Sequence, residues 1–511
     1  MHRTDCTGAG PGLGDSCREQ KSAELFRRNG LPLAAEAAVE WEWYGEETNS
    51  KYVVGCIDLP QPVPVDRLCF TRWSVEDSLV MDWKRKIILV SPFFYPELIS
   101  TGKANQSLAE AFAAEGHSVT VVCSHPVYPS WVPVRSDEKL PGMTILRGGS
   151  WVRYPRSMPM RRMLLELWFA AYACCRAWRL RKQADVVVSV LPPSLFALLL
   201  DRALPRSIRR VAVIHDLQGL LAAQERTPAR RVIIRTIHAV ERRVFQAQDL
   251  CIFFSADMAQ TAKASYRLNP ERIAVQYPCI TLASGAGAGG NRLESILPSG
   301  RVHVVYSGAL GYKQNSRQLV ALMQSAAQRF PGVQFHVFSG GPFFEELRNA
   351  SSSSTGPQVQ FHPLVEEQDL VELYARSAIQ VIPQAEGTEA AALPSKLPNL
   401  LAAGVHVLAI CNPGSEVERL LREAGTGTVV ERWEETLFLK GLSESLEVVA
   451  REAPSVRRDR VAPLLNRFSI SNMVRLVIGT SADRTNATLT VTQAETAANT
   501  AAVLAGHDHE G

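Results

Sequence analysis

Short, unbroken runs of apolar residues alternate with helical periods along the middle of the chain. The run from Ile87 to Val90 has no polar position, as expected of a strand buried on both faces of a sheet, and a helical period follows from about Asn105 to Ala114. A glycine then ends this period and a second apolar run begins, which makes a βαβ unit. The alternation continues through the segments ADVVVSVLPPSLFALLL, RRVAVIHDL and LCIFFSADMAQTAKAS. Residues 84–282 are therefore predicted to form a parallel sheet flanked by helices.

A second series of the same kind starts near residue 301. It begins with VHVVYSGALGYKQN, continues through VQFHVFSGG, VQFHPLV and DLVELYARSAIQVIPQ, and reaches VHVLAICN. Between the two series, residues 283–300 are rich in Gly, Ser and Ala and are predicted to be a linker. The pattern predicts an α/β protein with two Rossmann-like domains, at residues 84–282 and 301–465, whose parallel sheets face one cleft. Such a cleft most often binds a nucleotide-like ligand.

The two ends of the chain lack this pattern. Residues 1–83 show no continuous βα alternation, and because Met81 lies just before the first strand, they are either an N-terminal extension or the product of a misplaced start. Residues 466–483 are predicted to form a helix that crosses back to the first domain. Residues 484–511 have few large apolar side chains and are predicted to be disordered.

Composition narrows the range of functions. The 511 residues carry a formal net charge of only +4, which does not indicate a nucleic-acid partner. Ten cysteines occur without a CxxC spacing, as suits a reducing compartment. The N-terminus has no apolar signal-peptide core, and nowhere do about 18 apolar residues follow one another, the length that a membrane span requires. We therefore expect a cytoplasmic protein that is at most peripheral to the inner face of the cell membrane.

One stretch of the first domain combines basic and apolar residues as membrane-surface helices do. Residues 153–182, RYPRSMPMRRMLLELWFAAYACCRAWRLRK, place clustered arginines beside tryptophan, leucine and phenylalanine. This pattern is typical of a helix at an anionic membrane interface, and equally of a helix that packs on the sheet and has basic ends. Residues 226–243, RTPARRVIIRTIHAVERR, add positive charge to the same domain, which favours the membrane interface.

The segment LPSKLPNLLAAG, residues 393–404, places a lysine at an unusual point of a predicted short helix. Ser395 is a suitable N-cap, and Gly404 stands where a C-terminal stop is expected. Lys396 then lies in the first turn, where a cation faces the positive pole of the helix dipole at a cost of roughly 0.3 to 1 kcal/mol. An anion between the lysine and the helix would remove this cost, so the segment is a candidate anion site. The alternative is a plain surface lysine.

The order of several short motifs resembles that of a known family. SPFFYPELISTGKANQSLAEAFAAEGHSVTVVCSHPVYPSW is similar to the opening of bacterial family 4 glycosyltransferases of the colanic-acid and exopolysaccharide type. The resemblance continues through VLPPSLFALLL, VIHDLQ, FSADM, YSGALGYKQN, FSGGPFFEEL and LPSKLPNLLAAG, over roughly residues 85–480. It implies the GT-B fold of two Rossmann-like domains and transfer of a sugar, with retention of its anomeric configuration, from a nucleotide-sugar donor to a glycan acceptor. Together with the basic stretches, it favours an acceptor that is linked to lipid.

The resemblance assigns a basic residue and a helix N-terminus to the donor diphosphate. Lys313, and Lys396 with Ser395, stand at the matching positions, where cations would stabilise the charge that grows on the leaving group. Gly308 and Gly311 follow a buried strand, where the absence of a side chain lets phosphate approach backbone amides. A solvated loop lysine and plain tight turns are the alternatives for these residues.

Three more glycines are candidates for the donor site. Gly102 occupies the matching turn of the first domain, and Gly340 and Gly341 lie where the family places its nucleotide nearby, although a structural role suits the latter two better.

On the acceptor side the resemblance points to Asp216, which ends a strand and would hold or polarise the acceptor hydroxyl. Neighbouring His215 points to the opposite face of the strand, so we prefer Asp216. His125 and Glu97 are further candidates, with a hydrogen-bonded loop histidine and a helix N-terminal charge as their alternatives.

The sequence also departs from the family pattern. Ala391 and Asn399 stand where many members have glutamates, and Ala309 lies where an arginine is common. A catalytic metal is not expected, because no Asp-x-Asp pair follows a strand, and the nucleotide sugar is a substrate rather than a cofactor. Two alternatives to a transferase stay open: a nucleotide-sugar epimerase, which shares the fold, and a non-catalytic scaffold of a polysaccharide assembly complex.

Overall fold

The computed structural model of the chain describes residues 39–47, 50–57, 84–97, 99–222, 228–282, 291–351, 358–388 and 393–479. The predicted tail at 484–511 and the first part of the predicted linker, residues 283–290, lie outside this range. The chain divides into two compact units, Met1–Trp83 and Lys84–Gly511. In the first unit, β1 (Val39–Glu47) and β2 (Ser50–Ile57) form an antiparallel pair in which Trp43 is opposite Val53.

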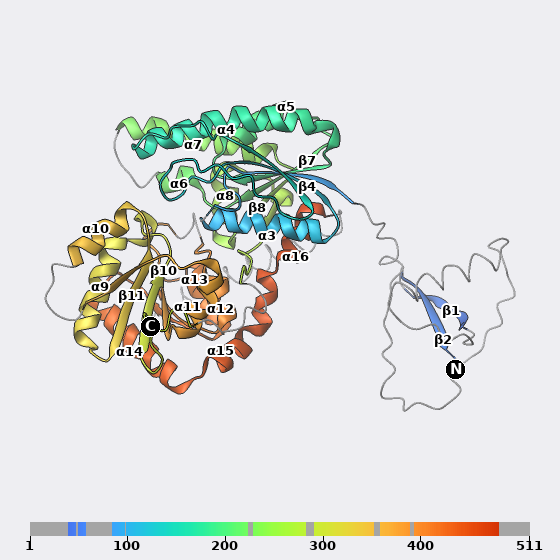
Figure 1. Ribbon diagram of the computed structural model, residues 1–511. Coiled ribbons are helices and arrows are strands. Elements are labelled where there is room, and N and C mark those ends of the chain that lie inside the picture. The colour runs from blue at the N-terminus through green and yellow to red at the C-terminus, as the bar shows by residue number, and fades with distance from the viewer. Residues whose placement is uncertain are drawn as a thin grey trace, which may run out of the picture. The chain divides into compact units, whose positions relative to one another are not determined.

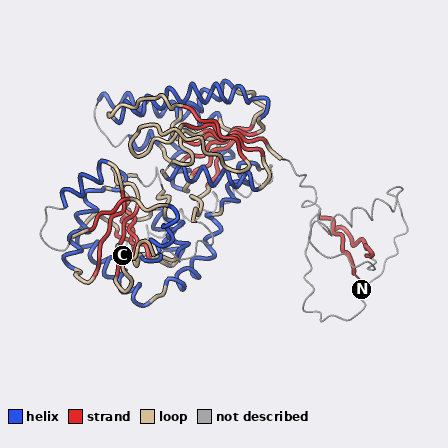
Figure 2. Tube along the Cα trace, in the orientation of Figure 1, coloured by secondary structure: helices blue, strands red, loops and turns tan. Residues whose placement is uncertain are grey.

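The first half of the second unit contains a parallel sheet of seven strands in the order β5-β4-β3-β6-β7-β8-β9. Helices cover both faces of this sheet, as Figures 1 and 2 show. Two of its strands, β6 and β8, are accordingly buried along their whole length. The strands are β3 (Lys86–Val90), β4 (Ser118–Ser124), β5 (Met143–Gly148), β6 (Val186–Leu191), β7 (Arg209–Ile214), β8 (Leu250–Phe253) and β9 (Ile273–Val275). The helices are α3 (Ser100–Ala114), α4 (Met158–Leu180), α5 (Leu195–Ala203), α6 (Gln218–Ala222), α7 (Pro228–Ala247) and α8 (Ala256–Tyr266).

The second half contains a parallel sheet of six strands in the order β12-β11-β10-β13-β14-β15. The strands are β10 (Val302–Ser307), β11 (Val333–Ser339), β12 (Gln360–Pro363), β13 (Ile379–Pro383), β14 (His406–Ile410) and β15 (Thr428–Val430). The helices are α9 (Ser316–Arg329), α10 (Pro342–Ser351), α11 (Leu370–Arg376), α12 (Leu397–Ala403), α13 (Glu416–Ala424), α14 (Glu435–Arg451), α15 (Pro454–Val461) and α16 (Ile470–Ile478). The predicted pair of Rossmann-like sheets is thereby confirmed.

In each sheet the strand order reverses once, between β3 and β6 in the first and between β10 and β13 in the second. In open parallel sheets this switch point is where the two adjacent connections diverge to opposite faces, and ligands bind beside it at the carboxyl ends of the strands. The fold therefore predicts that functional residues lie at the carboxyl edge of each sheet, beside the switch point.

The two domains are joined by two passages of the chain. In the first, the backbone N–H of Ile280 donates to the carbonyl of Phe468 at 3.1 Å, and the Gln276 side chain donates to the carbonyl of Arg467 at 2.8 Å. The second passage leads into α16, which packs beside α3 and buries Met473, Val474 and Val477 in the core of the first domain. Helix α16, the last helix that the structure describes, is thus a structural part of the first domain.

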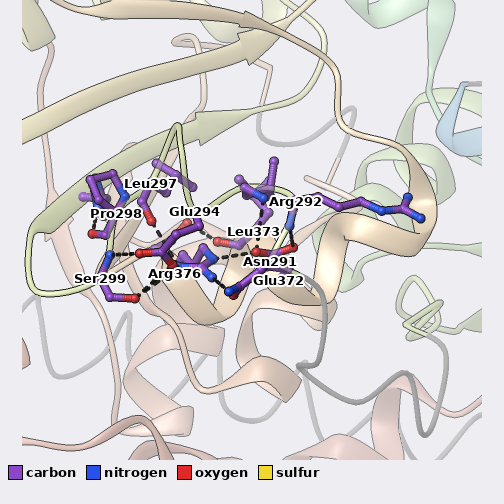
Figure 3. A network of polar contacts seen from close by, with 12 residues as sticks. Asn291, Arg292, Glu294, Leu297, Pro298, Ser299, Glu372, Leu373 and Arg376 are labelled. Atoms are coloured by element: carbon purple, nitrogen blue, oxygen red, sulfur yellow. Dashed lines mark hydrogen bonds and ion pairs between the residues drawn. The ribbon is translucent and has the colours of Figure 1, made fainter.

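The predicted linker is shorter than its composition indicates. Residues 291–300 fold onto the second domain, where Leu293 and Leu297 are buried. The Arg376 guanidinium holds this segment through hydrogen bonds and ion pairs (Figure 3). That guanidinium donates to Glu372 at 2.7 Å and to the side-chain oxygen of Asn291 at 2.9 Å, and pairs with Glu294. The Gly- and Ser-rich composition of 283–300 predicted a linker over the whole range, whereas residues 291–300 belong to the second domain.

Candidate functional site

Helix α12 starts one residue later than the sequence predicts. Ser395 was expected to be its N-cap, but the N-cap is Lys396, whose backbone already has right-handed helical angles, and no side-chain hydrogen bond caps the helix. Ser395 is exposed, and Gly404 ends the helix in the left-handed conformation, as predicted. Lys396 is therefore the residue that the turn before α12 positions.

The Lys396 side chain lies at the switch point of the second sheet. Its Nζ donates to the carbonyl oxygens of Ser307, the last residue of β10, at 3.2 Å and of Val381 in β13 at 2.8 Å. The ammonium also lies over the Tyr306 ring, 4.2 Å from its centroid. No carboxylate pairs with it among the described residues, and burial lowers its pKa to about 7. Two of its three N–H groups are used, which leaves one for a ligand.

Asp216 and Lys313 meet each other across the two domains. Asp216 stands two residues after β7 and Lys313 lies in a single 3₁₀ turn, Tyr312–Gln314, after β10. Their Oδ1 and Nζ atoms are 2.7 Å apart, and both side chains are partly exposed. The carboxyl edges of the two sheets are thus in contact through the two side chains that the sequence singled out. A second link, from Lys103 on α3 to Glu367 at 3.5 Å, joins the same two domains.

His215 packs against another residue than this pair. Its backbone N–H donates to the Leu191 carbonyl at 2.9 Å, and its ring meets Phe254 edge to face at 4.4 Å between centroids. Burial lowers the pKa of this imidazole to about 3, with Lys313 acting in the same direction. A neutral, enclosed histidine is a packing residue at this position.

The amides of Gly308 and Gly311 have partners within the second domain. The Gly308 amide donates to the Phe338 carbonyl at 3.0 Å, and the Gly311 amide donates to Ser316 Oγ at 2.8 Å. The amides of these two glycines thus have protein acceptors, and the approach of phosphate to the turns that they form stays a prediction. Gly308 and Gly341 have positive φ angles of 142° and 94°, which a larger residue adopts only with strain, and a Cβ on Gly341 would meet no atom within 4 Å.

Glu97 and Gly102 form one packed unit beneath the first domain's loops. The buried Glu97 carboxylate accepts from the backbone N–H groups of Val127 at 2.8 Å and Tyr128 at 3.1 Å. A Cβ on Gly102 would lie 2.9 Å from the Glu97 Cβ, so only glycine fits there. Glu97 is therefore neither a free acceptor ligand nor a simple helix charge, since it fixes the loop after β4.

His125 belongs to that same loop. Its Nδ1 accepts from the Ser136 amide at 3.2 Å, and its own amide donates to the Gly148 carbonyl at 3.0 Å. Burial lowers its pKa, and Arg147 adds to the shift, so the ring is neutral near pH 7. This placement matches the alternative of a hydrogen-bonded loop histidine.

Two carboxylates that no sequence motif indicates lie at the same edge of the first sheet as Asp216. Glu166 of α4 accepts from the amides of Ser194 at 3.1 Å and Leu195 at 2.9 Å, where α5 begins. Glu241 of α7 accepts from Gln218 and Gly219, where α6 begins, at 2.9 and 3.0 Å. Burial raises the pKa of both groups. Their helical positions carry no motif, and only the fold reveals that they cap helices at the carboxyl edge of the first sheet.

Asn399, which replaces a family glutamate, has its own partner. Its Oδ1 accepts from the Thr281 amide at 2.9 Å and its Nδ2 donates to Thr281 Oγ1 at 3.0 Å, so it ties α12 to the chain passage between the domains. The other replaced position, Ala391, lies outside the described residues. Within the part of the chain that the structure describes, no group of three or more His, Cys, Asp or Glu side chains is placed to hold a metal ion.

Comparison with known proteins gives both domains a counterpart. The model of Glycosyltransferase Family 4 matches residues 102–284, and the model of Glycosyl transferases group 1 matches residues 291–448. A curated relative, the putative colanic acid biosynthesis glycosyl transferase WcaI of Escherichia coli (strain K12), is 25% identical over 413 residues, which cover 72% of this chain and 95% of the relative.

Solved structures show the same fold at low identity. A sucrose-phosphate synthase from Thermosynechococcus elongatus superimposes with a TM-score of 0.60 at 17% identity, covering 77% of this chain and 98% of that one. WaaG, a glycosyltransferase involved in lipopolysaccharide biosynthesis, gives 0.56 at 16% identity and covers 77% of this chain and 100% of its own.

Proposed function

The chain belongs to the family 4 glycosyltransferases and has their GT-B fold, and from this premise we propose that it moves a hexose-type residue from a nucleotide sugar to a lipid-linked glycan with retention of configuration. The reaction is a step of cell-surface polysaccharide biosynthesis, as in the colanic-acid relative. Donor binding is assigned to the second domain and acceptor binding to the first.

The observation that carries this proposal is the Lys396 ammonium at the switch point between β10 and β13. Its two hydrogen-bond acceptors are carbonyl oxygens, and no carboxylate neutralises it among the described residues. A partly desolvated cation in this position binds an anion strongly because the surroundings screen it weakly. The diphosphate of a nucleotide sugar supplies that anion, and its charge grows as the bond to the anomeric carbon breaks.

The Lys313–Asp216 pair implies an order in which donor and acceptor bind. In the free protein the two groups neutralise each other at 2.7 Å. A donor diphosphate competes for Lys313, which releases the Asp216 carboxylate to accept a hydrogen bond from the acceptor hydroxyl. The acceptor oxygen then forms its bond to the anomeric carbon from the face that the diphosphate leaves, and its proton passes to the Asp216 carboxylate. The bond between the anomeric carbon and the phosphate oxygen breaks, and the nucleoside diphosphate departs. Donor binding before acceptor binding follows from this exchange.

A panel of nucleotide sugars incubated with a membrane extract tests the proposed function directly. A transferase consumes one donor only when an acceptor is present and places its sugar on the extract. An epimerase needs no acceptor and yields an isomeric nucleotide sugar, and a scaffold leaves every donor intact. Either of the last two results would contradict the proposal.

Donor affinity should depend on pH through Lys396. Because burial lowers its pKa to about 7 in the free protein, the ammonium that binds diphosphate is fully present below that pH and is lost as the pH rises above it. Donor binding at about pH 8.5, roughly 1.5 units above that pKa, is therefore expected to take up a proton and to be weaker than at pH 6.5 by up to about tenfold per unit. Calorimetry in two buffers of different ionisation enthalpy measures the uptake.

Lys396→Met provides the control for this prediction, since methionine keeps most of the side-chain volume and has no titrating group. Its donor affinity should be low at both pH values and its binding should take up no proton. If the parental protein bound donor without proton uptake at the higher pH, the link between Lys396 and the diphosphate would be wrong.

Helix α4 supports a peripheral membrane contact. Its buried side includes Trp168 and Phe169, so the alternative of a helix packed on the sheet holds for that side. Its opposite side exposes an apolar stripe, which consists of Met160, Met163, Leu167, Ala171 and Trp178. Neighbouring α7 exposes Val232 and Ile233. An apolar stripe beside clustered arginines fits an anionic membrane surface, and no helix among the described residues is long and apolar enough to cross a membrane.

Glutamates at Met163 and Leu167 should weaken binding to vesicles of anionic phospholipid. Each new negative charge costs about 1 kcal/mol near such a surface, so the double variant is expected to bind about thirtyfold more weakly. Val456→Glu, at an exposed apolar position of α15 in the second domain, is the matched control and should bind as the parent does. Vesicle flotation measures both, and equal binding of all three proteins would remove the membrane contact from the proposal.

A further inference from the structure

Asp216 lies in a short connection between β7 and α6 that is anchored on both sides. On one side the His215 amide donates to the Leu191 carbonyl at 2.9 Å, which attaches the connection to the sheet. On the other side α6 begins at Gln218, two residues after Asp216. Leu217, the residue between them, is buried in the core of the first domain. The position of the Asp216 carboxylate therefore depends on how the start of α6 is held.

Glu241 of α7 holds the start of α6. Its Oε1 accepts from the Gln218 amide at 2.9 Å and its Oε2 accepts from the Gly219 amide at 3.0 Å, so one carboxylate binds two consecutive N–H groups. The side chain is buried, and water therefore weakens these bonds little. Apolar packing of Leu217 has no preferred direction, whereas the paired hydrogen bonds fix the orientation of the start of α6 as well as its distance.

A third donor fixes the carboxylate itself. The Tyr266 hydroxyl of α8 donates to Glu241 Oε2 at 2.5 Å. The Tyr266 ring is buried, stacks on His238 at 4.6 Å between centroids, and meets Phe245 edge to face at 5.0 Å. Burial raises the pKa of the Glu241 carboxyl, and its three donors act in the opposite direction. Groups from α6 and α8 thus hold the carboxylate in one place.

The fit around Gly219 is an independent sign of this arrangement. A Cβ at this position would lie 2.8 Å from Glu241 Oε2, 3.2 Å from the Tyr266 hydroxyl and 3.4 Å from the His238 Cα. The first of these distances is shorter than van der Waals contact allows. Any side chain larger than that of glycine would therefore displace the carboxylate, and the close approach of α6 to Glu241 requires glycine here.

We propose that Glu241 is a positioning residue for sugar transfer, which holds the Asp216 carboxylate at the acceptor hydroxyl by fixing the start of α6. The inference rests on the proposed function, because it assumes the role of Asp216 given there. Its bonds to this part of the chain go to backbone amides, so Glu241 acts through the backbone and not as an acid or base. A displacement of about 1 Å at a reacting group lowers a rate by about a hundredfold.

Glu241→Gln keeps the size of the side chain and should lower kcat by about ten- to a hundredfold. Its amide group accepts with the oxygen but presents an NH₂ group to the second backbone N–H, so one of the two bonds is lost and the start of α6 shifts. Donor affinity should stay parental, since the donor is assigned to the second domain. The rates are measured with the nucleotide sugar that the panel identifies, at saturating donor and membrane extract.

Two further variants change the same contact in other ways. Gly219→Ala keeps the charge of Glu241 but displaces its carboxylate, and should lower kcat as Glu241→Gln does. Tyr266→Phe removes one donor and leaves both amide bonds in place, so its loss of rate should be smaller.

Glu372→Gln is the matched control. Glu372 of α11 is also buried and accepts from two consecutive amides, those of Arg292 and Leu293, at 3.2 Å each, but it lies in the second domain. The control should lose thermal stability to a similar extent as Glu241→Gln and keep the parental kcat. A loss of rate in Glu241→Gln alone would then be separate from the loss of stability that both variants share.

The double variant with Asp216→Asn distinguishes positioning from a general defect. If Glu241 acts through Asp216, Glu241→Gln should lower kcat in the parental protein and cause less than about a twofold further loss in Asp216→Asn. A general defect would lower the rate by the same factor in both proteins. Gly219→Ala is combined with Asp216→Asn in the same way, so the test does not depend on the folding of one variant.

The outcomes separate this role from the proposed function. A parental kcat in both Glu241→Gln and Gly219→Ala, an equal loss of rate in Glu372→Gln, or losses fully additive with that of Asp216→Asn would overturn the role of Glu241 alone. A parental kcat in Asp216→Asn, or a parental protein that consumed no nucleotide sugar, would instead overturn the proposed function, and the role of Glu241 with it.

Discussion

Replacement of Lys396 by alanine is expected to lower the rate of sugar transfer by about a hundredfold, or roughly 3 kcal/mol, the typical loss when one group that stabilises transition-state charge is removed. The loss should fall more on kcat than on donor affinity, because the charge that the ammonium meets grows as the glycosyl bond breaks. The geometry strengthens this expectation, since the ammonium is fixed at the switch point by the Ser307 and Val381 carbonyls.

Two further variants separate the charge of Lys396 from its packing. Lys396→Arg should recover only part of the rate, because the planar guanidinium cannot reproduce the contacts of the ammonium with both carbonyls and the Tyr306 ring. Ser395→Ala should cost little, since Ser395 is exposed and does not cap α12. Steady-state kinetics and thermal unfolding measured together decide the matter: a stable Lys396→Ala protein with the parental kcat would make this lysine a structural residue.

Asp216→Asn should reduce transfer by about a hundredfold or more, the range typical of a group that handles a proton in the transition state. Its effect on donor affinity should be opposite to that of Lys396→Ala. Loss of the carboxylate frees Lys313 from its 2.7 Å ion pair, so the donor no longer competes with Asp216 and should bind as well as before or better. Transfer and donor binding, measured separately, give opposite responses in this variant only if the pair acts as proposed.

Lys313→Ala is the partner variant and should lie between Ser395→Ala and Lys396→Ala in its loss of rate. In the double variant with Asp216→Asn the two losses should not add, because the residues contact each other in the free protein. Weaker donor binding in Asp216→Asn, or fully additive losses, would contradict the exchange of Lys313 between Asp216 and the diphosphate.

The sequence predicted the sheets well because their signal is local. Runs such as IILV from Ile87 to Val90 are buried on both faces, and such burial leaves a continuous apolar stretch that can be read without knowing the partner strands. The candidate residues at strand ends, Asp216 and Lys313, could likewise be located from the ends of such runs. Their direct contact could not, because nearly a hundred positions separate them and only the placement of two domains brings them together.

Other features depended on partners that no local pattern reveals. Helix α12 starts one residue later than predicted, and Lys396 takes helical angles while its side chain reaches the end of β10 and the middle of β13. This tertiary contact outweighs the capping preference of Ser395. Glu97 was predicted to be an acceptor-side residue or a helix N-terminal charge, whereas its carboxylate accepts from the amides of Val127 and Tyr128. The arginine cluster of α4 is typical of a membrane surface and equally of a packed helix, and no local pattern predicts that adjacent Arg161 and Arg162 have different surroundings.

The return of α16 to the first domain makes that domain discontinuous in sequence. Met473, Val474 and Val477 complete a core whose other residues end before residue 282. A fragment that stops at 282 would leave this apolar surface uncovered and should aggregate or bind α16 supplied as a separate peptide. The same reasoning applies to chimaeras between relatives. An exchange of the first domain has to include α16 as well, so the chain must be divided at two points, one before and one after the second domain.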